Sequence, residues 1–280
     1  MRFLVTGASG FTGAYLVAEL QARGLDAIPL EADITHPRTL AEAVAEARPD
    51  RVIHLAALAF AGSDDFAPFY QVNQIGTFNL LDAVSRTAPD AHVLIASSAN
   101  IYGNAREGYL DETTPPQPVN HYGVSKWAME VGAQLWRNRV RMTVTRPFNY
   151  TGVGQGEQYL IPKIVAHFRR REPVIRLGNI DVKRDFGDVR SVAAAYADLS
   201  ATPADAPVIN VATGSVWSIR EVIDAMTAMT GHRIEIEIDP ALVRVNEVKI
   251  LAGDPALLRA ILPHWKPRQL EDTLRWMLAG

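Results

Sequence analysis

A tyrosine and a lysine four residues apart carry the clearest catalytic chemistry in the sequence. Tyr122 and Lys126 are expected on one face of a helix, because residues i and i+4 are neighbours on a helical surface. The charge of Lys126 should lower the pKa of the Tyr122 phenol from its usual value of about 10. Tyr122 could then exchange a proton with a carbonyl or alcohol oxygen while hydride moves to or from a cofactor. Ser98, at the end of an earlier predicted strand, would hold that oxygen by a hydrogen bond.

A glycine-rich turn predicts a dinucleotide-binding site. It follows an apolar strand and opens a helix, so its backbone can approach a pyrophosphate and the helix N-terminus can meet the negative charge. The spacing GxxGxxG is a variant of the GxGxxG fingerprint. The residues of this turn expected at the cofactor are Gly7, Ser9, Gly10, Phe11, Thr12 and Gly13.

The end of the second predicted strand bears on which nicotinamide cofactor binds. An acid such as Glu31 would accept a hydrogen bond from the ribose 2′-hydroxyl of NAD, whereas an arginine would favour the 2′-phosphate of NADP. No Lys or Arg follows before Arg38, so NAD(H) is favoured and NADP(H) stays possible. Asp33 and Ile34 are expected near the adenine. The alternative is that Glu31 is a solvated strand-end acid and Asp33 a turn residue.

Positioning these residues requires a parallel sheet. Runs of continuous apolar residues indicate strands covered on both faces, and they alternate with helical patterns. Strands are predicted at residues 2–6, 26–30, 51–56, 92–97 and 142–145, and helices at 37–47 and 72–86. This alternation predicts an α/β fold with a doubly wound parallel (Rossmann) sheet. Residues 1–148 would form the dinucleotide-binding domain, to which later segments return.

The second half changes character after Pro147, where Gly and Pro separate shorter elements. A helix is predicted at 160–171, strands at 174–177, 208–211 and 233–238, and a further helix from Ser218. Ser218 and Glu221 fit a capping box at the start of that helix, and Gly231 would end it. Residues 149–280 are therefore expected to form mainly a smaller α/β substrate-binding lobe.

Composition excludes several functional classes. The 280 residues include 28 Lys+Arg and 31 Asp+Glu, for a net charge of −3, and no long basic run of the kind that nucleic-acid or membrane-surface binding needs. The absence of Cys excludes a thiolate nucleophile and a Cys-ligated zinc site, and no metal site is predicted. No apolar window reaches the roughly 18 residues of a membrane span, and no signal peptide is evident. A cytoplasmic enzyme is therefore expected.

These motifs together resemble the extended short-chain dehydrogenase/reductase family over nearly the whole chain. The matching stretches, in the family's order, are 6–13, 54–57, 72–73 with 76–77, 97–103, 122–126 and 146–149. The resemblance implies that Ser98, Tyr122 and Lys126 form the catalytic triad and that Asn73 supports the active-site backbone. Without it, Asn73 is equally a helix-surface amide, and His54 is a core histidine. The resemblance adds Leu55, Ala56, Ala57, Asn73, Tyr122, Lys126 and Pro147 to the expected cofactor-binding residues.

The second half is more specifically similar to the GDP-mannose dehydratase and GDP-4-keto-6-deoxymannose reductase branch. The stretches are 177–186, 146–149 with 152–155, and 247–248 with 253–254. Arg184 and Arg244 would then pair with the diphosphate of a nucleotide sugar, and Asn100 and Asn149 would contact substrate oxygens. Glu247 could accept the two adjacent donors of guanine. The alternatives are surface arginines and a solvated loop acid.

One departure separates the reactions of this branch. Dehydratases need an acid and a base, and family members place carboxylates soon after the catalytic Ser or Thr, whereas Ala99 and Asn100 follow Ser98 here. The sequence therefore favours reduction of GDP-4-keto-6-deoxymannose to a GDP-6-deoxyhexose of the rhamnose or talose series.

Three other functions are weighed against this one. They are a nucleotide-sugar 4-epimerase, a dTDP-4-keto-6-deoxyhexose reductase and a dinucleotide-binding protein without turnover. The presence of Tyr122 and Lys126 argues against the last of these. The family resemblance also implies a homodimer formed through the helices that carry Asn73 and Tyr122.

Overall fold

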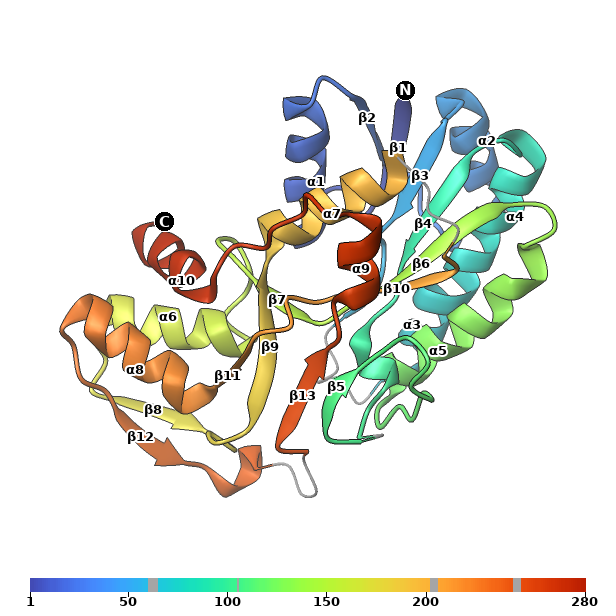
Figure 1. The fold of residues 1–280 in the computed structure, drawn as a ribbon. Helices are drawn as coiled ribbons and strands as arrows, with labels where there is room; N and C mark the ends of the chain where they lie inside the picture. Colours follow the sequence, from blue (N-terminus) through green and yellow to red (C-terminus); the bar gives the residue numbers. More distant parts are fainter. Residues whose placement is uncertain (60–64, 105, 202–205, 244–247) are drawn as a thin grey trace.

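A six-stranded parallel sheet forms the centre of the computed structural model, which describes residues 1–59, 65–104, 106–201, 206–243 and 248–280 (Figure 1). The strand order is β10-β6-β4-β3-β1-β2, so the chain winds outward in both directions from β1 and β3. The strands are β1 (Arg2–Thr6), β2 (Asp26–Leu30), β3 (Arg51–His54), β4 (His92–Ala96), β6 (Arg141–Pro147) and β10 (Val208–Val211). The predicted doubly wound fold is confirmed.

Helices cover both faces of this sheet, which explains why its strands are apolar throughout. One face packs against α2 (Pro37–Ala47), α4 (Thr77–Thr87) and α5 (His121–Ala133). The other face packs against α1 (Phe11–Ala22), α7 (Val189–Ala201) and α9 (Ala256–Ile261). Figure 1 shows α1, α7 and α9 in front of the sheet, with α2, α4 and α5 on its other side.

A second lobe lies beside the carboxyl ends of the central strands (Figure 1). Its sheet has the order β11-β9-β13-β5, with β7 also paired to β9, and a separate pair joins β8 to β12. These strands are β5 (Gly108–Leu110), β7 (Asn149–Thr151), β8 (Val174–Leu177), β9 (Lys183–Asp188), β11 (Val216–Ser218), β12 (Glu235–Ile238) and β13 (Ile250–Gly253). Its apolar core is closed by α6 (Leu160–Arg170), α8 (Ile219–Thr230) and α10 (Leu270–Ala279).

Several predicted boundaries match the structure and a few do not. The capping box at Ser218 and Glu221 is confirmed, and Gly231 ends α8 with a left-handed φ of 65°. The helix predicted at 72–86 is wrong in part, because a π-helical segment, η1 (Tyr70–Gly76), precedes α4. The strand predicted at 51–56 ends at His54. The short strands β5, β7 and β13 have too few residues to show a period. Strands β9 and β11 and helices α7, α9 and α10 were also not predicted. The remaining short elements are α3 (Ala67–Phe69), η2 (Ala99–Ile101), η3 (Gln134–Trp136) and η4 (Pro240–Leu242).

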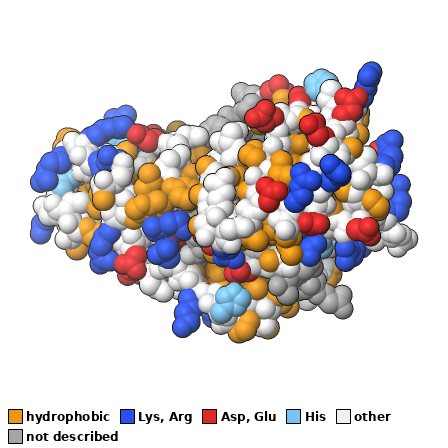
Figure 2. Space-filling view, turned by 90° about the horizontal axis from the view of Figure 1, so that it is seen from above, with side chains coloured by type: hydrophobic (Ala, Val, Ile, Leu, Met, Phe, Trp, Pro, Cys, Tyr) orange, Lys and Arg blue, Asp and Glu red, His pale blue; other side chains and the backbone are white. Residues whose placement is uncertain are grey.

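The surface carries charges of both signs. Figure 2 shows basic and acidic side chains interspersed over the face seen from above. In the described ranges, no helix combines the length and apolar character needed to cross a bilayer. No group of three His, Cys, Asp or Glu in those ranges is arranged to hold a metal ion.

Candidate active site

The glycine turn between β1 and α1 has no room for a side chain at Gly7 or Gly13. Gly7 has φ +66°, and a Cβ on it would lie 2.8 Å from the Ala56 nitrogen. A Cβ on Gly13 would lie 2.1 Å from the Gly7 carbonyl oxygen. Gly10 caps α1 without a side-chain hydrogen bond, and no acid stands in the first turn of that helix. Among the described residues, no side chain therefore accepts from the cap of α1 or places a negative charge in its first turn. The backbone amides there can bind the pyrophosphate of a dinucleotide.

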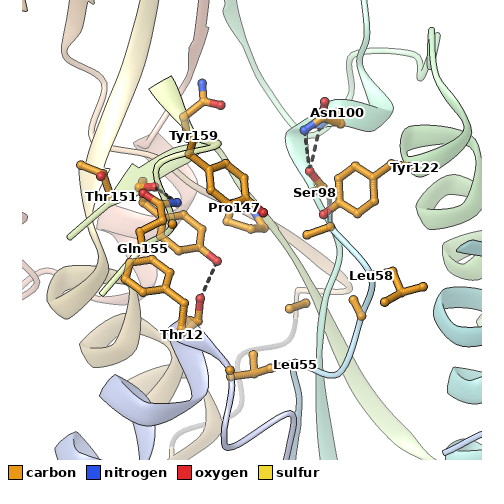
Figure 3. Close-up of a pocket in the computed structure, with 18 of the residues that line it drawn as sticks. Thr12, Leu55, Leu58, Ser98, Asn100, Tyr122, Pro147, Thr151, Gln155 and Tyr159 are labelled. Atoms are coloured by element: carbon orange, nitrogen blue, oxygen red, sulfur yellow. Dashed lines mark hydrogen bonds between the residues drawn. The ribbon is translucent and has the colours of Figure 1, made fainter. Parts of the chain in front are cut away.

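A cavity of about 780 Å³ opens between the carboxyl ends of the central strands and the second lobe. Its volume lies within the range of about 300 to 1,000 Å³ that small-molecule sites occupy. Figure 3 shows Ser98, Asn100 and Tyr122 on one side, with Thr12, Gln155 and Tyr159 opposite them. The predicted residues that line the cavity are Gly7, Gly10, Phe11, Thr12, Gly13, Leu55, Ala57, Ser98, Asn100, Tyr122, Lys126, Pro147 and Asn149.

The other residues predicted at the cofactor do not line this cavity, namely Ser9, Glu31, Asp33, Ile34, Ala56 and Asn73. Glu31 is exposed just beyond β2. The Asp33 carboxylate accepts hydrogen bonds from the backbone nitrogen and the hydroxyl of Thr35, both at 2.8 Å, so it shapes the turn. Ile34 is buried in the core against α4 and its neighbours. Their relation to the adenosine half of a cofactor stays a prediction.

Only two of the five residues predicted to bind the substrate line the cavity in the described structure. Asn100 and Asn149 line the cavity and are exposed. Arg184 is half-buried on β9, and its guanidinium donates to the carbonyl oxygens of Lys183 (2.8 Å) and Val248 (3.1 Å) instead of lining the cavity. Arg244 and Glu247 lie outside the described residues.

The three predicted catalytic residues converge from β4 and α5. Ser98 follows β4, and its Oγ accepts hydrogen bonds from the backbone nitrogen and the side-chain Nδ2 of Asn100, each at 3.1 Å. Both bonds use Ser98 Oγ as the acceptor, so its hydroxyl hydrogen remains available for a hydrogen bond to Tyr122. Asn120 caps α5 by accepting a hydrogen bond from the Gly123 nitrogen at 2.8 Å, which fixes the first turn on which Tyr122 stands. Lys126, one turn later, donates from Nζ to the Ala96 carbonyl oxygen at 2.8 Å.

The pKa of Tyr122 is shifted in the direction opposite to the one expected from the sequence. Burial raises the pKa of Tyr122 above its usual value, and a hydrogen bond from Ser98 offsets this only in part. The prediction that Lys126 lowers this pKa is therefore wrong for the structure. The reason is that desolvation of the phenol dominates, while the Lys126 ammonium is directed to the Ala96 carbonyl. A phenol that keeps its proton at neutral pH is suited to donate it.

Lys126 is itself strongly affected by its surroundings. Burial lowers the pKa of Lys126 to about 8, against an opposing effect of the Glu130 carboxylate one turn along α5. The side chain is 3% exposed, and its contact with Ala96 places the ammonium at the end of β4, two residues before Ser98. The charge of Lys126 therefore depends on pH in the physiological range.

Asn73 and His54 hold the backbone behind the cavity. Asn73 lies in the π-helical segment and is fully buried, not on the helix surface. Its amide accepts from the Leu58 nitrogen (2.8 Å) and donates to the Leu58 oxygen (3.0 Å) and to Ser125 Oγ (3.0 Å). His54 is hydrogen-bonded at both ring nitrogens, to Thr6 and Thr77, and burial lowers its pKa to about 3. His54 is therefore a neutral histidine of the core.

A buried ion pair joins α5 to strand β6 of the central sheet. Arg146 on β6 donates from Nη2 to Glu130 Oε2 at 2.7 Å and from Nε to both carboxylate oxygens at 3.2 Å. The two side chains are 5% and 3% exposed. Arg146 also donates to the Tyr102 hydroxyl at 2.9 Å, and that hydroxyl donates to Asn210 Oδ1 at 2.8 Å. This network ties the helix that carries Tyr122 and Lys126 to the central sheet.

The sequence analysis missed the tyrosines and the glutamine of the wall opposite Ser98. The hydroxyl of Tyr150 is hydrogen-bonded to Thr12 Oγ1 at 2.8 Å, and its ring stacks on Phe11 with centroids 6.3 Å apart. Gln155 donates to the Tyr150 carbonyl oxygen at 3.3 Å, and Tyr159 lines the same wall. The second lobe therefore closes directly onto the glycine turn. No local pattern could have shown this, because Thr12 and Tyr150 are 138 positions apart.

Comparisons with known proteins agree with this geometry. The family model of GDP-mannose 4,6 dehydratase matches residues 28–277. The GDP-6-deoxy-D-talose 4-dehydrogenase of Aggregatibacter actinomycetemcomitans is 35% identical over 268 residues, which cover 94% of this chain and 91% of that protein. The GDP-6-deoxy-D-mannose reductase of Pseudomonas aeruginosa is 34% identical over 294 residues, covering 99% of this chain and 96% of that protein.

A solved structure extends the likeness to three dimensions. The structure of RMD from Pseudomonas aeruginosa complexed with NADPH superposes with a TM-score of 0.90 at 32% identity, covering 100% of this chain and 98% of that chain. The extent of these matches settles the family that the sequence motifs predicted. The chain belongs to the GDP-mannose 4,6 dehydratase family of extended short-chain dehydrogenase/reductases.

Proposed function

We propose that the chain is an NAD(P)H-dependent nucleotide-sugar 4-keto reductase that converts GDP-4-keto-6-deoxymannose to a GDP-6-deoxyhexose of the rhamnose or talose series. The observation that carries the proposal is the pair of hydroxyls of Ser98 and Tyr122 on one cavity wall, with the amide of Asn100 beside Ser98 where a dehydratase needs a carboxylate. The two relatives are named as a dehydrogenase and a reductase of GDP-6-deoxy sugars, which are opposite directions of one reaction type.

The residues of the cavity divide the reaction between them. A bound reduced nicotinamide would supply the hydride that adds to the carbonyl carbon. Tyr122 donates its proton to the carbonyl oxygen, so the C=O bond becomes an alcohol and the tyrosine becomes a phenolate. Ser98, which donates its one hydroxyl hydrogen to Tyr122 before substrate binds, would turn that hydrogen to the same oxygen and orient it. The ammonium of Lys126 donates to the Ala96 carbonyl oxygen in this structure. It would turn toward the phenolate once that forms and stabilise it until solvent restores the proton.

The dinucleotide would lie along the glycine turn. Gly7, Gly10 and Gly13 let the pyrophosphate approach the start of α1, and Leu55, Ala57 and Pro147 line the continuation of the cavity toward Tyr122. Exposed Glu31 beyond β2 favours NAD(H), because a carboxylate accepts from a ribose hydroxyl and repels a 2′-phosphate. The neighbouring structure from Pseudomonas aeruginosa is complexed with NADPH, so both reduced cofactors belong in the assay.

A panel of substrates tests the proposal. GDP-, dTDP- and UDP-4-keto-6-deoxyhexoses are incubated with NADH or NADPH, and cofactor oxidation and product NMR are recorded. We expect oxidation of the cofactor with the GDP sugar and a product of one C4 configuration. Faster turnover of the dTDP sugar would contradict the choice of base. Epimerisation at C4 without net cofactor oxidation would contradict the reductase.

GDP-mannose is expected not to be dehydrated at an appreciable rate. Residues 99 and 100 supply no acid, and Glu112 is occupied elsewhere, since its Oε1 accepts from the Asn210 nitrogen at 2.7 Å. In the described part of the cavity lining, Asp65 is the single carboxylate. The measurement is the formation of GDP-4-keto-6-deoxymannose from GDP-mannose by NMR. Formation that disappears in Asp65→Asn would identify Asp65 as the missing acid and overturn the assignment.

Reduction is expected to slow as the pH rises through about 8. The Lys126 ammonium, whose pKa burial lowers to about 8, is charged below that pH and neutral above it. Loss of its charge removes the stabilisation of the developing phenolate. Tyr122 itself stays protonated across this window because burial raises its pKa. The dependence of kcat on pH from 6 to 10 checks this, and a flat profile through pH 9.5 would contradict it.

A homodimer is proposed through α5 and the helix beside it. Val131 and Leu135 are 51% and 77% exposed on α5 and the turn that follows it, and Ile75 of the adjacent π-helical segment is 40% exposed. Such apolar side chains on one face suit a second copy of the chain. Val131→Glu/Leu135→Glu should convert a dimer to a monomer in sedimentation velocity. Val119→Glu, at a 64% exposed apolar residue before α5, is the control and should stay dimeric. A monomeric wild type would contradict the proposal.

A further inference from the structure

A second hollow, on the second lobe, is lined by three basic side chains. It has a volume of about 320 Å³ and lies where the turn between β10 and β11, the end of α9 and the segment before α10 meet. Arg259, Lys266 and Arg268 line it, and all three are exposed to solvent. Its described lining contains no Asp or Glu, and it shares only Phe186 with the catalytic cavity.

Within the part of the chain that the structure describes, no acid pairs with these three cations. In the ranges that the structure describes, none of them forms an ion pair, whereas other arginines of the same part of the chain do. Arg190, Arg220 and Arg275 pair with Asp188, Asp181 and Asp272, respectively. Like charges gathered in a hollow repel one another and raise the local concentration of anions.

The acid behind this lining is bound to neutral donors, not to the three cations. Asp185 is fully buried. Its carboxylate accepts hydrogen bonds from the Thr213 nitrogen (3.2 Å) and hydroxyl (2.7 Å) and from the Gly214 nitrogen (2.9 Å). The hollow therefore presents positive charge to solvent.

The basic side chains project from a fixed frame. Arg259 donates from Nη2 to the Thr213 carbonyl oxygen at 2.9 Å, which holds its guanidinium at the hollow. The segment with Lys266 and Arg268 is anchored at both ends to Ser191 of α7. Trp265 Nε1 donates to the Ser191 carbonyl oxygen at 2.9 Å, and the Arg268 nitrogen donates to the Ser191 hydroxyl at 3.0 Å. A frame fixed in this way lowers the ordering cost of binding.

We propose that this hollow binds a small phosphate-bearing molecule at a site separate from the catalytic cavity. The guanidinium groups of Arg259 and Arg268 match the geometry of phosphate oxygens, and the Lys266 ammonium adds a third positive charge. The volume of about 320 Å³ is at the lower end of the range for small-ligand sites. Half-buried Trp217 lines the same hollow and offers an aromatic surface to a base. The proposal does not depend on the reaction proposed above.

Calorimetry with two probes tests this site. Inorganic pyrophosphate and AMP are titrated separately into the enzyme saturated with NADPH and GDP, so that the cofactor and nucleotide-sugar positions of the catalytic cavity are both occupied. We expect one binding site per chain, and Lys266→Glu/Arg268→Glu should weaken binding at least about tenfold. Arg38→Glu/Arg86→Glu changes the net charge equally on α2 and α4, where these side chains are 91% and 70% exposed, and should leave binding unchanged. Thermal melting confirms that both double variants are folded.

The results show which kind of ligand binds, and they also show whether the proposal fails. Tighter binding of AMP than of pyrophosphate, with the difference lost in Trp217→Leu, assigns a nucleotide, whereas equal binding of the two assigns a bare phosphate group. No binding of either probe to the wild type overturns the proposal. Equal losses in the two double variants would also overturn it, because the effect would then reflect total charge. Turnover is not the readout, so this result stands apart from that of the substrate panel.

Discussion

Replacing Tyr122 by Phe is expected to lower kcat by at least about a hundredfold while cofactor affinity is retained. The substitution removes the one hydroxyl that burial keeps protonated beside Ser98, and loss of a general acid costs about 10² to 10⁴ in rate. The ring itself remains, so its packing against Phe69, with centroids 6.3 Å apart, is preserved. Single-turnover reduction of the GDP-4-keto sugar gives the rate, and NADH or NADPH fluorescence gives the affinity.

Tyr109→Phe is the matched control for this variant. Tyr109 is 50% exposed and does not line the cavity, so loss of its hydroxyl should leave kcat within about twofold. A Tyr122→Phe enzyme that keeps near-normal kcat would remove the proposed proton donor. A loss of cofactor affinity as large as the loss of rate would assign Tyr122 to binding instead.

Replacing Arg146 by Met is expected to destabilise the fold by about 3 to 5 kcal/mol. The change leaves the Glu130 carboxylate, whose side chain is 3% exposed, without its cation in the interior. It also leaves the Tyr102 hydroxyl without the hydrogen bond that Arg146 donates. Urea unfolding measures the loss, which should come with lower turnover because Glu130 lies on the same helix as Tyr122 and Lys126.

Two comparisons isolate the charge effect in this prediction. Arg38→Met removes the same side chain from an exposed pair with Glu42, where the two are 91% and 64% exposed, and should cost less than about 1 kcal/mol. Arg146→Met/Glu130→Leu removes both buried charges and should recover much of the lost stability. A single Arg146→Met variant as stable as Arg38→Met would show that the buried pair is not needed.

The local features of this protein could be predicted from its residues alone. The apolar runs, the glycine turn after β1 and the capping box of α8 depend on residues close together in the chain, so their patterns predict them directly. The same holds for the i, i+4 relation of Tyr122 and Lys126 on α5. Alternation of strands and helices then restricts the topology, because parallel strands need crossover helices. Fold class and family followed from these local signals.

The pKa values and the hydrogen-bond partners of those residues depend on the folded structure. Desolvation raises the pKa of Tyr122 although Lys126 stands one turn away, and burial depends on every element packed around the cavity. The contact of Thr12 with Tyr150 and the pairing of Glu130 with Arg146 join separate elements, so no spacing rule contains them. Arg184 matches the diphosphate motif in sequence, yet its guanidinium donates to two backbone carbonyl oxygens and does not line the cavity. Local patterns show which groups are present. Their charge and their partners depend on solvent exclusion and long-range contacts, because these arise only when the chain folds.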